Sequence, residues 1–247
     1  MRHLADLPFD DLADGSVVTI GAFDGIHLGH KQLLRRVVDV ATPTGRPAIV
    51  MSFEPTPKEF FGGDTPPARL MRFREKFDAL AERKIDLFYC PRFSSDMRNI
   101  SASDFIRRIL VHGLNARHLV IGDDFRFARR REGSVAELLA AGRALDMSVE
   151  QVPSILIGDT RVSSSVIREA LQHGDVPRAN QLLGRPYRMS GKVVAGRQVG
   201  RTLGYATANV DLRRRRSAVM GIYAVRVHGL DEGVVDGVAS VGTRPTF

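Results

Sequence analysis

The run GAFDGIHLGH at residues 21–30 carries the most distinctive chemistry of the sequence, because it follows a short apolar segment and opens a helical pattern. A strand that ends in a glycine-rich turn and leads into a helix presents free backbone N–H groups and the positive end of the helix dipole to an anion. Gly21, Gly25 and Gly29 allow a ligand to approach the backbone closely, and Phe23 lies within the same turn. These residues predict a phosphate-binding turn.

Two histidines of this turn, His27 and His30, are three residues apart and are expected to project to one side of the helix start. Their imidazole groups could contact phosphate oxygens there. The same HxxH spacing also occurs in half of a metal site, but no third ligand accompanies it here. GxxxxGK[ST] is absent and the spacing does not fit GxGxxG, which weighs against a P-loop kinase and an ordinary dinucleotide dehydrogenase.

A second helix start with anion-binding chemistry is predicted further along the chain. It combines three consecutive serines with two flanking arginines: Ser163, Ser164, Ser165, Arg161 and Arg168. A serine at this place can act as a helix N-cap and nothing more. That simple interpretation leaves the arginines unexplained, since their guanidinium groups would add fixed positive donors beside the helix start.

The elements that must position these segments alternate between strands and helices over the first 160 residues. We expect strands at 17–20, 47–53, 85–89, 118–121 and 148–152, and helices at 31–41, 69–83, 103–113, 135–145 and 163–172. This alternation predicts an α/β fold, a Rossmann-like parallel sheet with helices on both faces. Beyond residue 186, period-two apolar segments separated by glycines predict a small antiparallel β module. We therefore predict two domains, residues 1–186 and 187–247.

Composition narrows the class of protein. The chain has 247 residues, 43% of them hydrophobic, which allows a sizeable core and excludes disorder, collagen and coiled coil. No window reaches the roughly 18 apolar residues of a membrane helix, and the aspartate-rich start does not read as a signal peptide. Cys90 is the single cysteine, so neither an intrachain disulfide nor a cysteine-based zinc site can form. We expect a soluble, cytoplasmic protein.

The net charge of +8 raises the possibility of a nucleic-acid partner. Residues 187–247 contain ten Lys or Arg and four Asp or Glu, whereas residues 1–186 contain 26 and 24. Much of the excess is the run Arg213–Arg216, which we interpret as a solvated loop. Because Trp is absent and no basic motif is interleaved with aromatic residues, we expect small-molecule partners, not nucleic acid or a membrane.

The HxGH form of the first turn resembles the nucleotidylyltransferase superfamily, whose members transfer a nucleotide from an NTP to a phosphate or similar acceptor and release pyrophosphate. Residues 163–168, SSSVIR, resemble the SSTxIR-type element that grips ATP phosphates in that superfamily. FEPTP at 53–57 and GDDFRF at 122–127 resemble segments of prokaryotic FAD synthetases, which are bifunctional riboflavin kinase/FMN adenylyltransferases. GRTLGYATAN at 200–209 and GVASVGTRPTF at 237–247 resemble the signatures of the kinase half.

The resemblance implies that the first domain binds ATP with Mg²⁺ and transfers AMP to FMN, giving FAD and pyrophosphate. Charge neutralisation and positioning should dominate, because the attacking phosphate oxygen is already anionic. The implied catalytic residues are His27, His30 and Arg168. The implied phosphate contacts are Gly21, Phe23, Gly25, Gly29, Arg161, Ser163, Ser164 and Ser165. The implied wall on the flavin or adenosine side consists of Asp124, Phe125, Phe53 and Pro55.

The sequence departs from the family pattern at several positions. Ala22 stands where Asn is frequent and Ala128 where Gly is usual, but neither change removes a charge. In the kinase half, the resemblance implies that Thr207 and Asn209 hold Mg²⁺ and the ATP phosphates. It also implies that a Glu beyond the GTRPTF segment deprotonates the ribityl hydroxyl of riboflavin. Glu232 is the only Glu of this module and precedes that segment. We therefore expect a truncated kinase module that cannot phosphorylate riboflavin.

Two alternatives remain open at the level of sequence. One is a nucleotidylyltransferase for another acceptor, such as a cytidylyltransferase or a pantetheine-phosphate adenylyltransferase, which would leave the C-terminal motifs unexplained. The other is a noncatalytic flavin or polyanion-binding protein, which predicts salt-dependent binding of polyanions and no release of pyrophosphate.

Overall fold

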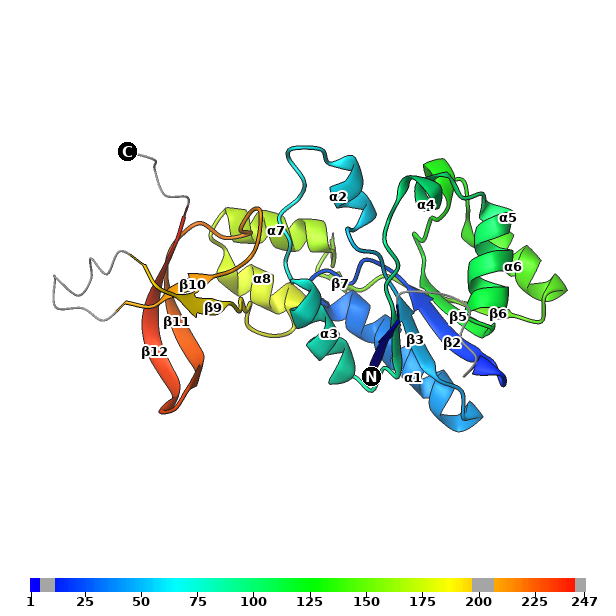
Figure 1. The fold of residues 1–247 in the computed structure, drawn as a ribbon, viewed down its shortest axis with the longest axis horizontal. Helices are drawn as coiled ribbons and strands as arrows, with labels where there is room; N and C mark the ends of the chain where they lie inside the picture. The colour runs from blue at the N-terminus through cyan, green and yellow to red at the C-terminus, as the bar shows by residue number, and fades with distance from the viewer. Residues whose placement is uncertain (5–11, 197–206, 243–247) are drawn as a thin grey trace.

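The computed structural model describes residues 1–4, 12–196 and 207–242 of the chain. Its larger part is built on one six-stranded sheet with the spatial order β1-β4-β3-β2-β5-β6, in which every pair of neighbours is parallel (Figure 1). The predicted parallel sheet is confirmed. Its strands are β1 (Arg2–Leu4), β2 (Ser16–Ile20), β3 (Ala48–Met51), β4 (Leu87–Tyr89), β5 (Ala116–Gly122) and β6 (Ser148–Val152).

Strand β2 occupies the centre of the sheet, with β3 on one side and β5 on the other. Its sequence SVVTI is buried throughout, as expected for a parallel strand that is covered on both faces. The connections leave β2 in opposite directions, so the strand order reverses between β2 and β5. In open α/β sheets a crevice forms at the carboxyl ends of the strands at such a point.

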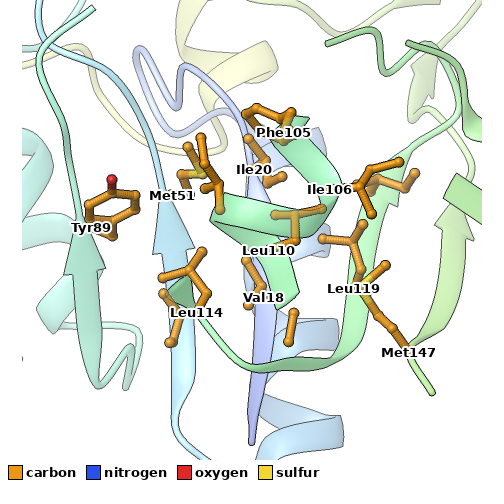
Figure 2. Packing of buried hydrophobic residues seen from close by; sticks show 14 of the residues in the cluster. Val18, Ile20, Met51, Tyr89, Phe105, Ile106, Leu110, Leu114, Leu119 and Met147 are labelled. Carbon is orange, nitrogen blue, oxygen red and sulfur yellow. The ribbon is translucent and has the colours of Figure 1, made fainter. Parts of the chain in front are cut away.

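Helices cover both faces of this sheet, and adjacent residues of β2 serve the two sides. Val18 packs with Leu110 and Leu119 in one apolar cluster, shown in Figure 2, whereas Val17 belongs to the cluster that contains Val37 and Phe88. The first cluster lies under α5 (Ala102–Asp104), the π-helix η2 (Phe105–Gly113) and α6 (Val135–Ala144), and the second under α1 (Leu28–Thr44) and α3 (Phe73–Ala81).

A third apolar cluster joins two further helices, α7 (Ser164–Gln172) and α8 (Val176–Leu183). A helix start with Ser163 or Ser164 as its N-cap was predicted, and α7 begins after the N-cap Ser163. The sequence analysis did not identify α8, nor several short elements: β1, α2 (Pro57–Phe61), α4 (Ser95–Asn99), the 3-10 turn η3 (Arg129–Arg131), β7 (Leu156–Ile157) and β8 (Thr160–Arg161).

The helix predicted over 69–83 is wrong at its first four residues, because α3 begins only at Phe73. The backbone N–H groups of Leu70 and Met71 donate to the carboxylate of Asp24, at 3.0 and 2.9 Å. This partner is remote in sequence, and it holds the segment in a conformation that local propensity does not predict.

The C-terminal part consists of antiparallel strand pairs at one end of the molecule, beyond α7 and α8 (Figure 1). They are β9 (Lys192–Val194) with β10 (Asn209–Asp211), and β11 (Gly221–Leu230) with β12 (Gly233–Val241). The predicted antiparallel module is confirmed. Within the described ranges it forms two separate two-stranded sheets, not a closed barrel. Most of the GRTLGYATAN motif and the end of GVASVGTRPTF lie outside the described residues.

The interpretation of Arg213–Arg216 as a solvated loop is wrong for one member. The side chain of Arg214 is only 2% exposed, because it contacts the first domain. Ala218 and Val219 follow it into the third apolar cluster, at 1% and 3% exposure. The segment after β10 therefore packs against the part of the chain that contains the six-stranded sheet and α3.

Replacing Leu110 by alanine should lower the free energy of unfolding by about 3 kcal/mol, since the side chain is completely buried between η2 and the sheet. Urea denaturation of the full chain measures this change. Leu139→Ala on α6 is the control, because Leu139 is 41% exposed and should cost well under half as much. Equal losses in the two variants would contradict the assignment of the core.

Candidate functional site

A cleft of about 510 Å³ lies at the carboxyl ends of the central strands. The segments that follow β2, β3, β5 and β6 all contribute to its walls. It therefore occupies the switch point of the sheet, the usual place for a ligand in this fold class. Most of the predicted site residues line it: Gly21, Phe23, His27, Gly29, His30, Phe53, Asp124, Phe125, Arg161, Ser164 and Arg168.

Four predicted residues of the first domain are absent from the cleft lining. Gly25 lies in the turn, where its carbonyl oxygen accepts from Arg185 at 2.8 Å. Ser163 uses its hydroxyl to cap α7, accepting from the N–H of Val166. The other two are Ser165, which is exposed in the first turn of α7, and Pro55, which follows a cis peptide bond.

The turn after β2 takes an unusual backbone path that brings its histidines to the helix start. Phe23, Gly25 and Ile26 have φ values of 48°, 90° and 42°, in the left-handed region. Glycine is the residue that adopts this region without strain, and Phe23 and Ile26 compensate by being fully buried. His27 is then the N-cap of α1, and its Nδ1 accepts from the N–H of His30 at 3.3 Å.

The imidazole rings of His27 and His30 stack, with centroids 3.6 Å apart. The pKa of His27 is lowered to about 4, mainly by burial; the charge of Asp24 opposes this shift, and the charges of Arg161 and Arg168 add to it. Burial, followed by the charge of His27, also lowers the pKa of His30. Both rings are therefore neutral near pH 7 in the absence of an anion. The buried Nδ1 of His30 has no hydrogen-bond partner among the described residues.

Asp24, which the sequence analysis did not select, ties the two helix starts together. Its side chain is buried and forms an ion pair with Arg168 at 2.5 Å, in addition to accepting from the N–H groups of Leu70 and Met71. The hydroxyl of Ser164 donates to the carbonyl oxygen of Asp24 at 2.8 Å. The glycine-rich turn and the start of α7 are thus fixed against each other at one corner of the cleft.

A buried lysine supports the same turn from beneath. Lys76 on α3 is 3% exposed, and its Nζ donates to the carbonyl oxygen of Ala22 at 2.7 Å. Burial lowers the pKa of this ammonium group, and the charge of Asp24 opposes that effect. The sequence alone offers no signal for this role, because Lys76 lies within an ordinary amphipathic helical pattern.

Several arginines of the cleft already have carboxylate partners. Arg161 contacts Asp124 at 2.7 Å and Asp123 at 3.6 Å, and its side chain is 46% exposed. Arg69 forms ion pairs with Glu54 and Glu59. These pairs reduce the positive charge that the cleft presents.

Three further cations line the cleft, and no carboxylate pairs with them among the described residues: Lys58, Arg126 and Arg131. The sequence analysis quoted a segment that contains Arg126, but it gave neither arginine a role. Whether a cation is free depends on the absence of an acidic neighbour in space, which residue spacing does not reveal. The three side chains are the cleft's available positive charge.

One departure from the family pattern has a structural consequence. Ala128, which stands where Gly is usual, has φ 63° and ψ −175°. Side chains other than glycine rarely adopt this conformation. The family preference for glycine at this position therefore has a backbone reason.

Thr207 and Asn209, the predicted kinase residues, lie in the second domain and outside the cleft. Asn209 is paired with Val194 across the β9–β10 ladder, and Thr207 is exposed just before it. A Cβ atom at Gly196 would lie 2.2 Å from the side-chain amide of Asn209, so a side chain at residue 196 would displace that amide.

Within residues 1–4, 12–196 and 207–242, no three His, Cys, Asp or Glu side chains are grouped as a metal site. In the same part of the chain, no helix has both the length and the apolar character needed to cross a bilayer.

Comparisons with known proteins match both parts of the chain. The FAD synthetase family model matches residues 10–166, and the riboflavin kinase family model matches residues 183–247. The bifunctional riboflavin kinase/FMN adenylyltransferase of Escherichia coli K12 is 44% identical over 233 residues, which cover 94% of this chain and 74% of the relative. The enzyme of the same name from Haemophilus influenzae is 41% identical, with coverage of 94% and 76%.

A solved structure agrees over the full length. The crystal structure of a macrolide-efflux protein from Streptococcus pneumoniae has a TM-score of 0.83 and 29% identity, covering 100% of this chain and 81% of that one. The kinase family model matches as far as residue 247, so the expected truncation of the kinase module is not confirmed and stays a prediction.

Replacing His27 by glutamine should change how stability depends on pH. Because the pKa of His27 is about 4 in the folded chain and near 6.5 when unfolded, the unfolded state binds more protons between these values. The stability of the original chain relative to His27→Gln should therefore fall by about 3 kcal/mol from pH 7 to pH 4. Urea denaturation at a series of pH values tests this, and parallel profiles would contradict it.

Proposed function

The chain belongs to the bifunctional riboflavin kinase/FMN adenylyltransferase family, and on that premise we propose how its cleft transfers AMP from ATP to FMN, giving FAD and pyrophosphate. The observation that carries the proposal is the convergence of two helix starts, α1 and α7, on one cleft that also contains two imidazoles. We assign residues 1–186 to the adenylyltransferase and residues 187–247 to the riboflavin kinase domain.

In this transfer a phosphate oxygen of FMN attacks the α-phosphorus of ATP. A new P–O bond forms, the bond from the α-phosphorus to the bridging oxygen breaks, and its electron pair leaves with pyrophosphate. The attacking oxygen is already anionic, so no side chain has to remove a proton from it. The work of the cleft is to bring two anions together and to stabilise the charge that moves to the leaving group.

We assign His27 and His30 to the transferred phosphate and the leaving pyrophosphate. Their rings lie at the N-terminus of α1, where the helix dipole also favours negative charge. An entering phosphate would raise the imidazole pKa values, because an adjacent negative charge favours the protonated form. Hydrogen bonds from the rings to phosphate oxygens would then become charge-assisted.

The two arginines beside α7 differ in what they can do. Arg168 is largely buried on Asp24, so it holds the corner together while presenting charge to the cleft. Arg161 is about half exposed on Asp124, and such a pair exchanges partners at small cost. We propose that Arg161 turns to the triphosphate when ATP binds, while Gly21, Phe23, Gly25, Gly29, Ser163, Ser164 and Ser165 shape the backbone around it.

The opposite wall of the cleft is aromatic. Phe53 and Phe125 line it, and their rings are supported by Phe93 at 5.4 Å and Phe127 at 5.8 Å. Flat aromatic groups stack on such surfaces, which suits the flavin or the adenine ring. We assign Phe53, Pro55, Asp124 and Phe125 to this side.

The residues of the cleft fit a magnesium ion that arrives with the phosphates of ATP. Mg²⁺ prefers oxygen ligands and commonly uses one or two carboxylates together with phosphates and water. Asp123 and Asp124 are the exposed carboxylates here, at 40% and 63%, and would hold it. The ion would draw electron density from the phosphate oxygens. In the kinase domain we assign Thr207 and Asn209 to Mg²⁺ and ATP, since both supply oxygen donors.

The alternatives raised by the sequence lose support. Another acceptor class does not account for the riboflavin kinase match at residues 183–247, and a noncatalytic binding role does not account for the FAD synthetase match. The family assignment favours one enzyme with two flavin-directed activities.

The chain should release pyrophosphate and form FAD when incubated with FMN, ATP and Mg²⁺, and His30→Ala should reduce the rate about a hundredfold or more because transition-state charge loses its stabilisation. Chromatography of the flavins with a coupled pyrophosphate assay measures both products. Arg143→Ala on the exposed side of α6 is the control. Absence of FAD at every enzyme concentration would reject the proposal.

Replacing both Arg126 and Arg131 by alanine should raise the KM for ATP or FMN about tenfold or more, because two unpaired cations of the cleft are lost. The neighbouring Arg129→Ala is the matched control, since its charge is already paired with Glu132 at 3.1 Å outside this cleft. Steady-state kinetics at two salt concentrations measure the effect. An equal KM in the double variant and the control would remove these cations from the binding site.

A further inference from the structure

Arg214 reaches from the second domain into the first. Its Nη1 donates to the carbonyl oxygens of Arg69 and Leu70, at 3.0 and 3.2 Å, and to the hydroxyl of Tyr187 at 3.2 Å. Its Nη2 forms an ion pair with Glu75 at 2.7 Å. This set of partners uses the planar fork of the guanidinium group, which lysine cannot reproduce.

Arg214 contacts the segment of residues 69–71, whose backbone N–H groups bind the carboxylate of Asp24. Leu70 accepts from Arg214 through its carbonyl oxygen and donates to Asp24 through its N–H, at 3.0 Å. Asp24 in turn binds Arg168, and its carbonyl oxygen accepts from Ser164. A continuous series of polar contacts therefore runs from the second domain to the corner of the cleft where Asp24 binds Arg168. We call this corner the phosphate corner.

Ser190 makes a second contact from the second domain, with Glu75 on helix α3. The N–H and the hydroxyl of Ser190 both donate to Oε1 of Glu75 at 2.8 Å, while Oε2 accepts from the N–H of Arg72 at 2.6 Å. Glu75 thus caps the start of α3 and joins both domains. Ala218 and Val219 add buried apolar contact beside it.

The burial of Arg214 is not explained by its sequence neighbours. Arg215 and Arg216 are exposed, as expected for a basic loop. Burying one guanidinium group of such a run costs free energy unless its charge is paired and its N–H groups are hydrogen-bonded. The contacts of Nη1 and Nη2 with Glu75 and two backbone carbonyl groups supply most of that compensation, whereas Nε has no hydrogen-bond partner among the described residues. The residue therefore has a specific position.

We propose that Arg214 is a positioning residue for adenylyl transfer, through which the riboflavin kinase domain holds segment 69–71 and, with it, the Asp24–Arg168 corner of the cleft. The inference rests on the proposed function of that cleft. By thermodynamic reciprocity, an anion bound at the corner also strengthens the contact between the domains.

The kinetic test compares Arg214→Ala and Arg214→Lys with Arg215→Ala and Arg216→Ala from the same run. We expect kcat/KM for FAD synthesis to fall at least tenfold in Arg214→Ala, with a higher KM for ATP, because the phosphate corner loses its support. Arg214→Lys should recover part of the loss through its ion pair with Glu75. The two controls should stay within about twofold of the original chain.

The outcomes separate this inference from the function on which it rests. If the original chain makes FAD and Arg214→Ala matches the controls, the positioning role is overturned. If the original chain makes no FAD, the proposed function fails, and the exchange measurement below still decides the link between the domains.

Hydrogen exchange of the Ser190 N–H group provides a readout that does not need turnover. A nonhydrolysable ATP analogue should slow this exchange about fivefold, because binding at the corner strengthens the contact with Glu75. The slowing should disappear in Arg168→Ala, whose change is confined to the first domain. An unchanged rate in the original chain, or a response that persists in Arg168→Ala, would overturn the link.

Discussion

The buried carboxylate of Asp24 is the interaction on which the site depends. An isolated charge with 6% exposure would be strongly destabilising, but Arg168 and the N–H groups of Leu70 and Met71 compensate for its lost hydration. These partners come from segments more than 40 residues away in the chain. Satisfying one carboxylate therefore fixes three separate segments, and the convergence of the two helix starts on one cleft follows from it.

Exposure divides the charges of the cleft into a fixed and an exchangeable group. The pair of Asp24 and Arg168 is buried, so separating its members would leave a charge unpaired in a poorly solvated place. The pair of Arg161 and Asp124 is half exposed, and water can take over from either partner. The first pair can act as a scaffold, and the second can release its arginine to a phosphate without disturbing the fold.

Features that depend on local chemistry were predictable from the sequence, and those that depend on a remote partner were not. The buried run of β2 and the N-cap of α7 at Ser163 are local, and the structure confirms both. The helix predicted over 69–83 begins only at Phe73, because Asp24 accepts from the N–H groups of Leu70 and Met71. The prediction that Arg214 is solvated was wrong for the same reason. Its neighbours in sequence are exposed, whereas its partner Glu75 is remote in the chain.

The neutral state of the histidine pair follows from the same electrostatic arrangement. Burial is the main reason that the pKa values of both rings are lowered. At His27 the charges of Arg161 and Arg168 add to this effect against the opposing charge of Asp24, and at His30 the charge of Lys76 adds to it. A bound phosphate reverses this balance, because it neutralises the neighbouring cations and attracts the imidazole proton. Near pH 7 an anion in the cleft therefore favours protonation of the rings. Protonation of the rings therefore stabilises most strongly the state of the reaction in which the phosphates carry the most negative charge. Pyrophosphate is stabilised in this way as it leaves.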